Sequence, residues 1–264
     1  MLFSYYLNRA PEAARADGMD KTNVGKLTPG TTLSVIVPCC NEERYLRTRV
    51  EKLLDIADDQ LALELIIVDD KSRDGSPDIA RRLEETHPEI TVLVHDKSRG
   101  KGAALATGFK HATGSIVAVH DGDPEYDPHD LKPLVVPIIE GKADVVLGSR
   151  FPATGKHRSA YFWQSLTNKG LTLISTIFSG LNLTDMEGCY KVFRREIVQA
   201  ISLEEERFGL QPEIAAKVSQ VRVLIFDMGV SYYVTIHLPK AVEPLHKRAY
   251  SPGHQLKAWI AHRF

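Results

Sequence analysis

Two aspartates with one residue between them, Asp121 and Asp123, follow an apolar run, Ser115–Val119, that predicts a buried strand. Because side chains at positions i and i+2 of an extended chain point to the same side, both carboxylates can face one cation at the carboxyl end of that strand. Hard divalent cations bind one or two carboxylates, and substrate phosphates and water complete the shell. The pattern is typical of a site that holds a diphosphate through its metal. Taken alone, it also fits an ordinary turn after a strand.

A similar polar cluster follows the first apolar run of the chain. Pro38-Cys-Cys-Asn-Glu-Glu43 opens a predicted helix, where exposed N–H groups and the positive end of the helix dipole favour anions. Asn41 and Glu42 also suit simple helix capping, so both anion binding and capping remain open for this cluster. Neither the glycine fingerprint of dinucleotide-binding proteins nor a P-loop motif is present in the sequence.

Two more clusters follow the second and third apolar runs. Val68-Asp-Asp-Lys-Ser-Arg-Asp-Gly75 carries the carboxylates Asp69 and Asp70, which can accept hydrogen bonds from a base or ribose, or cap a turn. Ser98-Arg-Gly-Lys-Gly102 places Lys101 between glycines, where its charge can approach a ligand or remain solvated.

Basic residues follow the fifth apolar run. Arg150 lies in Gly148-Ser-Arg-Phe151, and Arg158 comes shortly afterwards. Because guanidinium groups bind phosphate oxygens in pairs, the two arginines can form a fork for a second phosphate. A solvated basic loop is the alternative.

Regular alternation of strands and helices must position these clusters. The patterns predict strands over Leu33–Val37, Leu63–Val68, Ile90–Val94, Ser115–Val119 and Val145–Leu147, and helices over Glu42–Ala57, Ser76–Thr86 (with Ser76 as cap), Lys101–Ala112 and Leu131–Glu140. Fully apolar strands that alternate with helices indicate an α/β fold with a mostly parallel sheet covered on both faces. Ligands of such sheets bind beyond the carboxyl ends of the strands, where every cluster above lies.

The second half of the sequence is less regular. It predicts a long, largely helical segment over Tyr161–Leu183, a short strand over Tyr190–Phe193, a helix over Pro212–Gln220, and strands over Val221–Phe226 and Val230–Ile236. We expect one catalytic domain over residues 31–236, preceded by a poorly ordered arm (1–30) and followed by a basic tail (237–264).

Composition narrows the function classes. The chain has 264 residues, 43% hydrophobic and 25% charged, and a net charge of −1, so no overall field points to nucleic acid as a partner. Its three cysteines do not suggest a disulfide framework, which indicates a reducing, cytoplasmic compartment. No apolar run reaches the ~18 residues of a membrane span. The basic tail with Trp259 is a candidate membrane-surface contact, which suggests a peripheral position at the inner face of the membrane, or else a solvated terminus.

The ordered set of motifs resembles the family 2 glycosyltransferases of GT-A fold, and among them the dolichol- and polyprenyl-phosphate sugar transferases. The resemblance runs from about Leu33 to Tyr233. The matching pieces are Val37-Pro-Cys-Cys-Asn-Glu42, Val68-Asp-Asp-Lys-Ser-Arg-Asp-Gly75, Arg99-Gly-Lys-Gly-Ala103, Asp121-Gly-Asp123, Gly148-Ser-Arg150, Thr184-Asp-Met-Glu-Gly-Cys-Tyr-Lys191 and Arg207-Phe-Gly-Leu-Gln-Pro-Glu213. It implies a Rossmann-like catalytic domain that uses Mg²⁺ or Mn²⁺. This domain moves a sugar with inversion from a GDP- or UDP-linked donor to a polyprenyl phosphate or a glycan.

The resemblance also implies roles for individual residues. The metal and diphosphate would be held by Asp121 and Asp123, with Glu125 as a third contact. The implied nucleotide-sugar site contains Pro38, Cys40, Glu42, Asp69, Asp70, Lys101, Gly122 and Lys191, and the implied acceptor-phosphate site contains Arg150, Arg158 and Ser159. The family usually has an aromatic residue at the position of Cys40.

The acceptor decides whether a general base is needed. A monophosphate is mostly dianionic at neutral pH, since its second pKa is about 6, and it requires only positioning. A hydroxyl acceptor requires a base, for which Glu213, Asp185 and Glu187 are candidates. Glu213 also suits a helix start, where a carboxylate is favourable. A further alternative is a non-catalytic module that binds nucleotide sugars.

Overall fold

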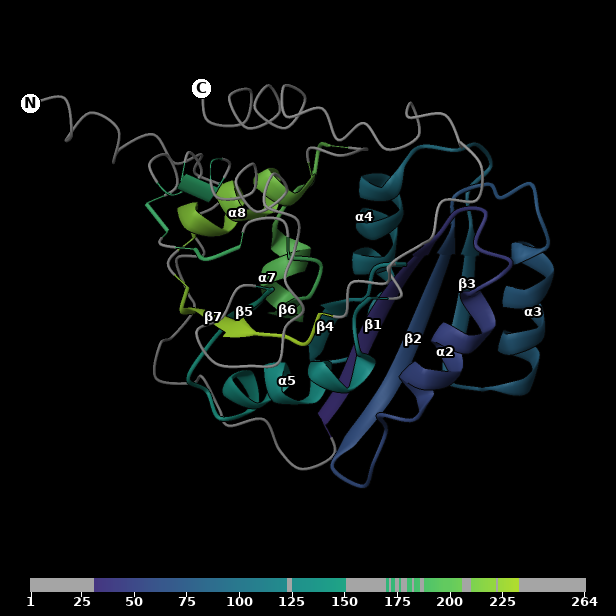
Figure 1. The fold of residues 1–264 in the computed structure, drawn as a ribbon, viewed down its shortest axis with the longest axis horizontal. Helices are drawn as coiled ribbons and strands as arrows, with labels where there is room; N and C mark the ends of the chain where they lie inside the picture. Colours follow the sequence, from purple (N-terminus) through teal and green to yellow (C-terminus); the bar gives the residue numbers. More distant parts are fainter. Residues whose placement is uncertain are drawn as a thin grey trace, which may run out of the picture.

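A computed structural model describes residues 31–122, 125–150, 170, 172–173, 176, 180–181, 183–185, 188–205, 210–221 and 223–232. Within these residues, one seven-stranded sheet has the order β3-β2-β1-β4-β6-β5-β7 (Figure 1). Its strands are β1 (Thr31–Cys39), β2 (Leu61–Asp69), β3 (Ile90–Val94), β4 (Ile116–Val119), β5 (Val145–Ser149), β6 (Lys191–Arg194) and β7 (Ile225–Gly229). The predicted α/β class with a mostly parallel sheet is confirmed.

Strand β6 is antiparallel to both of its neighbours, β4 and β5, while the other pairings of the sheet are parallel. Its first residue, Lys191, therefore pairs with Val119 near the carboxyl end of β4 and with Leu147 in β5. This reversal delivers a basic residue from late in the chain to the edge where the parallel strands end.

Helices cover both faces of the sheet (Figure 1). The apolar side chains of α2 (Leu46–Leu54), α3 (Ser76–Thr86) and α5 (Leu131–Ile139), the last preceded by the short η3 (Pro128–Asp130), pack with Val35 and Val37 of β1. Those of α4 (Lys101–His111), α7 (Arg195–Ala200) and α8 (Leu210–Gln220) pack with Ile36 on the opposite face. Alternate residues of one buried strand thus contribute to two separate cores, as expected for a strand covered on both sides.

Several elements match their predicted bounds, notably α3 and β3. The first helix begins four residues later than predicted, at Leu46, because residues 43–45 form a turn. Ser76 was expected to cap α3 but is its first helical residue. Its hydroxyl instead accepts a hydrogen bond from the N–H of Glu42 at 2.8 Å.

The prediction was wrong at the end of the described chain. One strand, β7, occupies Ile225–Gly229, where two flanking strands over Val221–Phe226 and Val230–Ile236 were expected. Of the second predicted strand, the described residues form only an isolated bridge between Tyr126 and Tyr232. Helix α7 was not predicted. The arm (1–30), the tail (237–264) and most of the predicted helix over 161–183 lie outside the described residues.

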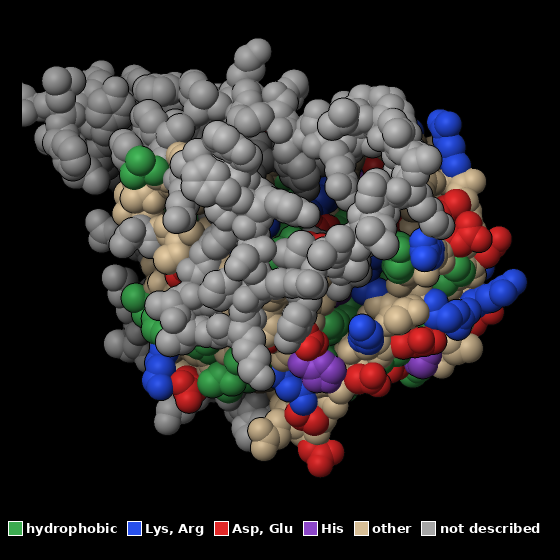
Figure 2. All heavy atoms as spheres, in the orientation of Figure 1, with side chains coloured by type: hydrophobic (Ala, Val, Ile, Leu, Met, Phe, Trp, Pro, Cys, Tyr) green, Lys and Arg blue, Asp and Glu red, His purple; other side chains and the backbone are tan. Residues whose placement is uncertain are grey.

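Acidic and basic side chains are interspersed over the side of the molecule that α2 and α3 form (Figure 2). This mixture agrees with the net charge of −1. Among the helices that the structure describes, none has the length and apolar character needed to cross a bilayer.

Gly108 sets how closely α4 approaches the sheet. A Cβ atom added at this position would lie 2.3 Å from Cγ2 of the fully buried Ile36. We expect Gly108→Ala to reduce the free energy of unfolding by about 1–3 kcal/mol, because overpacking outweighs the gain in helix propensity. Urea denaturation measures the change. Lys110→Ala, at an exposed site of the same helix, is the control, and equal stability of the two variants would contradict this packing.

Candidate active site

The carboxyl edge of the sheet collects most of the residues that the sequence analysis selected. Asp69 ends β2, Lys101 begins α4, Asp121 follows β4, Arg150 follows β5, and Lys191 starts β6. Three predicted site residues, Asp123, Arg158 and Ser159, lie outside the described residues. The fold therefore brings the described candidates to one edge, and their individual geometry distinguishes between their roles.

Backbone and side-chain hydrogen bonds tie the loops after β1 and β2 together. The Asn41 amide oxygen accepts from the N–H of Arg73 at 2.8 Å, and the Asn41 N–H donates to the Ser72 hydroxyl at 2.9 Å. Asp69 is buried and accepts from the N–H of Ser72 at 3.2 and 3.3 Å. Asn41 has a positive φ of 57°, a conformation that asparagine tolerates better than most residues. Asp69 caps a turn, as one of its two interpretations allowed, whereas Asn41 joins two loops and does not cap α2, whose N-cap residue is Tyr45 with no side-chain hydrogen bond.

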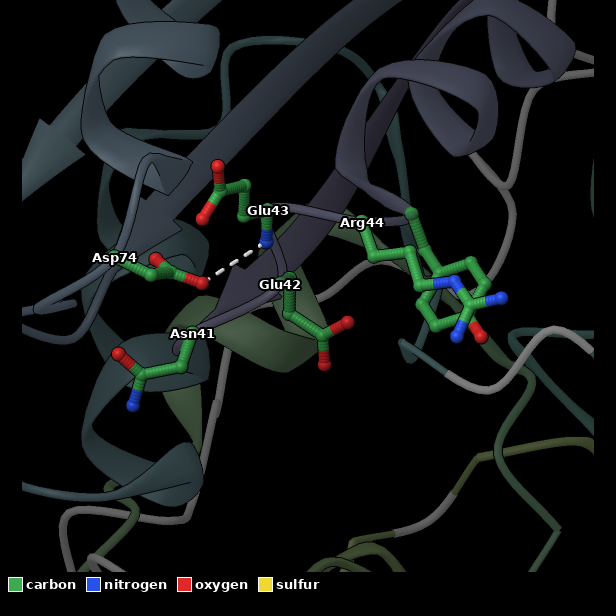
Figure 3. A pocket seen from close by; sticks show the side chains of 6 residues that line it. Asn41, Glu42, Glu43, Arg44 and Asp74 are labelled. Atoms are coloured by element: carbon green, nitrogen blue, oxygen red, sulfur yellow. Dashed lines mark hydrogen bonds between the residues drawn. The ribbon is translucent and has the colours of Figure 1, made fainter. Parts of the chain in front are cut away.

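A pocket of about 580 Å³ opens beside the loop after β1 (Figure 3). It is lined by Asn41, Glu42, Glu43, Arg44, Tyr45 and Asp74. The N–H of Glu43 donates to Asp74 at 3.1 Å, while the side chains of Glu42 and Glu43 point in different directions (Figure 3). Of the residues expected around the nucleotide, only Glu42 lines this pocket. Cys40 is exposed, with its thiol 3.9 Å from the carbonyl oxygen of Asp70.

The carboxylate of Asp70 anchors the loop that leads into α4. Its Oδ1 accepts from His95 Nδ1 and from the N–H of Arg99, both at 2.8 Å. Its Oδ2 accepts from the Ser98 hydroxyl and the N–H of Gly100, also at 2.8 Å. A carboxylate has about four lone-pair positions, so these donors occupy its acceptor capacity. The geometry favours a positioning role over the contact with a base or ribose that the resemblance implies.

Lys101 is the residue that this anchored loop presents. Its ammonium forms an ion pair with Asp121 across the strand ends. Burial raises the pKa of Asp121, but the charge of Lys101 and hydrogen bonds from Lys101 and the N–H of Gly122 outweigh burial and lower it to about 2. Asp121 is therefore an ionised carboxylate at neutral pH, as a ligand for a hard cation must be.

Arg49 was missed by the sequence analysis. Its Nη2 donates to the carbonyl oxygen of Gly122 at 2.6 Å and to Glu42 at 3.1 Å. The available signal was its position in α2, on the buried stripe between Leu46 and Leu53. A charged residue on an apolar stripe requires a partner, since burial of an unpaired charge is costly.

Arg150 forms a two-pronged ion pair with Asp185. Its Nε lies 2.7 Å from Oδ2 and its Nη2 lies 3.0 Å from Oδ1. Burial lowers the pKa of Arg150, but Asp185 raises it above its ordinary value, so the guanidinium stays charged. The ring of Tyr232 lies beneath it, 5.6 Å from the guanidinium carbon. An acceptor phosphate would contact other atoms of this group or displace Asp185.

The contacts around Arg150 and Tyr232 also involve two other candidate residues, Asp185 and Glu125. The side chain of Asp185 is fully buried against Arg150, which favours charge compensation over action as a general base. The hydroxyl of Tyr232 donates to Glu125, the residue expected to be a third metal contact. Glu187 lies outside the described residues.

Lys191 is buried at the start of β6, and its ammonium donates to the carbonyl oxygen of Gly188. Burial is the largest of the effects that lower its pKa to about 8; nearby Cys189 and Asp185 oppose the shift, and the positive charges of Lys101 and Arg150 add to it. The backbone approaches closely here, because a Cβ atom at Gly188 would lie 2.0 Å from the carbonyl oxygen of Gly148. Lys191 thus faces a site that already contains two other cations.

Glu213 is fully buried on α8. Its oxygens accept from the N–H groups of Glu204 and Glu205 at 2.7 and 2.9 Å, and one lies 2.8 Å from the ammonium of Lys217. Glu213 lies in the first turn of α8, and its carboxylate is bound to the preceding segment and to Lys217, which argues against the role of general base.

The described carboxylates suit a divalent cation in part. Asp121 supplies an ionised oxygen ligand, and Asp123 follows it by two residues. No group of three or more potential metal-ligating side chains gathers at one point among the residues that the structure describes. Substrate phosphates would therefore have to complete the coordination shell, as is usual for Mg²⁺.

Comparison with known proteins identifies the class. The sequence profile of glycosyl transferase family 2 matches residues 34–202, and the chain belongs to this family of glycosyltransferases. It is 29% identical over 202 residues to a dolichol-phosphate mannosyltransferase from Pyrococcus furiosus, an alignment that covers 75% of this chain and 56% of that protein. It is 27% identical over 183 residues to a UDP-N-acetylglucosamine–dolichyl-phosphate N-acetylglucosaminyltransferase from Methanococcus voltae, covering 64% and 71% of the two chains.

The fold is shared with solved structures. Glucosyl-3-phosphoglycerate synthase from Mycobacterium tuberculosis, in complex with phosphoglyceric acid, superposes with a TM-score of 0.63 at 16% identity, over 89% of this chain and 80% of that one. A second structure of that enzyme, with a TM-score of 0.63 and 16% identity, contains Mn²⁺, UDP-glucose and phosphoglyceric acid and covers 88% and 80% of the two chains. At this identity the likeness shows the GT-A fold.

The anchoring role of Asp70 makes stability depend on pH. Burial raises the pKa of Asp70, but hydrogen bonds from Arg99, His95, Gly100 and Ser98 hold it below the ordinary value of 3.8. A carboxyl group with a lowered pKa in the folded state stabilises the protein above the unfolded value, and this contribution is lost as pH falls through the folded value. We expect Asp70→Asn to reduce the free energy of unfolding at pH 7 by about 2–4 kcal/mol, because buried donors lose their acceptors.

Denaturation by urea at several pH values measures this difference. The gap between wild type and Asp70→Asn should start to narrow as pH falls below about 4, where the unfolded chain becomes protonated. It should narrow further through the lower pKa of the folded state, where the native carboxylate becomes protonated. Asp78→Asn, at an exposed site of α3, is the matched control and should show no gap. A gap for Asp70→Asn that stayed constant into acid would contradict the anchoring role.

Proposed function

We propose that this glycosyltransferase moves a sugar from a nucleotide-diphosphate sugar to a polyprenyl (dolichyl-type) phosphate in a reaction that depends on Mg²⁺ or Mn²⁺ and inverts the anomeric carbon. One observation carries the proposal: Asp121, ionised and paired with Lys101, stands at the carboxyl end of the central strand β4. The names of the relatives support the lipid-phosphate acceptor.

Charge compensation is the main chemical task of the site. As the bond between the anomeric carbon and the diphosphate breaks, its electron pair stays on the departing diphosphate. A divalent ion held by Asp121 and Asp123 would supply Lewis-acid stabilisation of that charge. Lys101 and Lys191 would add positive charge to the same group, and fixed charges of this kind stabilise developing charge without reorganisation.

A phosphate acceptor fits the described residues better than a hydroxyl acceptor. An oxygen of a dianionic phosphate attacks the anomeric carbon without loss of a proton, so no general base is needed. Of the three candidate bases, Glu213 and Asp185 are buried in ion pairs. Arg150, together with Arg158, would orient the acceptor phosphate, with Ser159 beside them.

The metal role predicts that Asp123→Ala abolishes turnover. Removal of one of two carboxylate ligands weakens the hold on the metal and diphosphate, and we expect at least about a hundredfold loss of activity. The assay measures nucleoside diphosphate released from UDP- and GDP-linked donors with Mn²⁺, with and without polyprenyl phosphate. Asp78→Ala is the control. Donor binding without turnover in wild type under all these conditions would instead indicate a non-catalytic module.

The pKa of Lys191 predicts that kcat/KM for the donor falls at alkaline pH. Because kcat/KM reports the ionisations of the free enzyme, kcat/KM for the donor should fall as pH rises through about 8, where Lys191 loses its proton. In Lys191→Arg the side chain stays protonated, and the fall should disappear. The same fall in both proteins would show that another group is responsible.

A further inference from the structure

The side chain of Arg49 contacts the backbone at Gly122, the residue directly after Asp121. Its Nη2 donates to the carbonyl oxygen of Gly122 at 2.6 Å, and Glu42 accepts from the same nitrogen at 3.1 Å. Gly122 lies directly between Asp121 and Asp123 in the chain. One guanidinium group therefore joins α2, the loop after β1 and the loop after β4.

Burial makes this contact unusual. Only 6% of the Arg49 side chain is exposed, and its neighbours on the same stripe of α2 are Leu46, Val50 and Leu53. Arg47, two residues earlier in the same helix, has a side chain that is 51% exposed. A buried arginine is costly unless its charge is paired and its donors are bound, so a purely apolar side chain would serve the core as well or better.

The packing around Gly122 fits this arginine. A Cβ atom added at Gly122 would lie 2.9 Å from the Glu42 carboxylate and 3.2 Å from both terminal nitrogens of Arg49. A methyl group at this position would therefore require the Glu42 carboxylate and the Arg49 guanidinium to shift. Gly122 and Arg49 therefore fit closely together, as expected if the arginine supports the backbone at Gly122.

Two buried nitrogens remain beside this contact. Arg49 Nη1 and His120 Nδ1 have no hydrogen-bond partner among the residues that the structure describes. His120 is 2% exposed and directly precedes Asp121. Buried polar nitrogens therefore lie both on Arg49 and on His120, the residue that directly precedes Asp121.

We propose that Arg49 is a positioning residue for the metal site: it fixes the backbone at Gly122, and through it the adjacent Asp121 carboxylate, for one divalent ion and the donor diphosphate. The inference rests on the proposed function of that site. It assigns no contact with the substrate to Arg49, which acts through the Gly122 carbonyl and Glu42.

The test measures Mn²⁺ binding directly, in the presence of UDP or GDP, by loss of the free-Mn²⁺ electron paramagnetic resonance signal. Substitutions of groups that orient metal ligands typically weaken metal affinity about 10- to 100-fold. We expect that loss for Arg49→Ala, an intermediate loss for Arg49→Lys, and none for the control Arg47→Ala. Guanidinium ion at millimolar concentration should restore Mn²⁺ binding to Arg49→Ala, whereas sodium chloride at equal ionic strength should not.

A double-mutant cycle gives an independent readout. Gly122→Ala should weaken Mn²⁺ binding more when Arg49 is present than in the Arg49→Ala protein. The added methyl group would meet Glu42 and the guanidinium, and loss of Arg49 removes one of these contacts and the hydrogen bond that holds Glu42 in place. Residues in contact show such non-additive effects. Purely additive losses would contradict a direct role of the pair.

The outcomes separate the two claims. If wild type binds Mn²⁺ with the nucleotide but Arg49→Ala and Arg49→Lys bind it within twofold of wild type, the positioning role is wrong and the proposed function stands. If Arg49→Ala does not fold, Arg49→Lys and the cycle of Arg49→Lys with Gly122→Ala decide. If wild type shows no Mn²⁺-dependent nucleotide binding, the proposed function fails, and the inference fails with it.

Discussion

The ion pair between Lys101 and Asp121 is the interaction on which the site depends. It joins the first residue of α4 to the end of the central strand β4, and it keeps a partly buried carboxylate ionised. A carboxylate in such surroundings would otherwise favour the protonated form, which does not suit a hard cation. Without substrate, the lysine supplies the positive charge that balances Asp121. Binding of a divalent ion and a diphosphate would change the contacts of this lysine.

The rest of the described fold holds these two residues in place from several directions. Asp70 fixes the loop before Lys101, and Arg49 supports the turn after Asp121. The reversed strand β6 brings Lys191 next to β4. Each support is a buried charged group with defined hydrogen bonds, and groups of this kind are costly to bury unless every partner is present. The site is thus a preorganised cluster of charges at one edge of a hydrophobic sheet.

The sequence was sufficient to predict the parts of the fold that depend on local periodicity. Apolar runs and helical spacing gave the parallel core and the edge where the polar clusters meet, because a strand buried on both faces leaves a simple pattern. It predicted a strand that overlaps β7 but not the bounds of β7, and it did not predict α7. It identified Asp121 and Lys101 as site candidates by type and position, since strand ends converge regardless of detailed geometry, whereas Lys191 came from the resemblance to the family.

Side-chain partners were harder to predict. Asp70 was expected to contact the nucleotide, but four donors from one distant loop occupy its carboxylate, and no local pattern indicates that loop's path. Arg49 was missed because its partners, Glu42 and Gly122, come from other segments. Contacts between segments far apart in the sequence depend on tertiary packing, which periodicity does not record.

The central claim is that Asp121 binds a divalent ion that carries the donor diphosphate. A crystal structure with Mn²⁺ and a nucleotide-diphosphate sugar, with data collected at the manganese absorption edge, tests it most directly. The account predicts an anomalous peak within bonding distance of Asp121 and of the diphosphate oxygens, with the Lys101 ammonium turned toward the phosphates. A bound nucleotide whose manganese lies away from Asp121, with the Lys101–Asp121 ion pair unchanged, would contradict it.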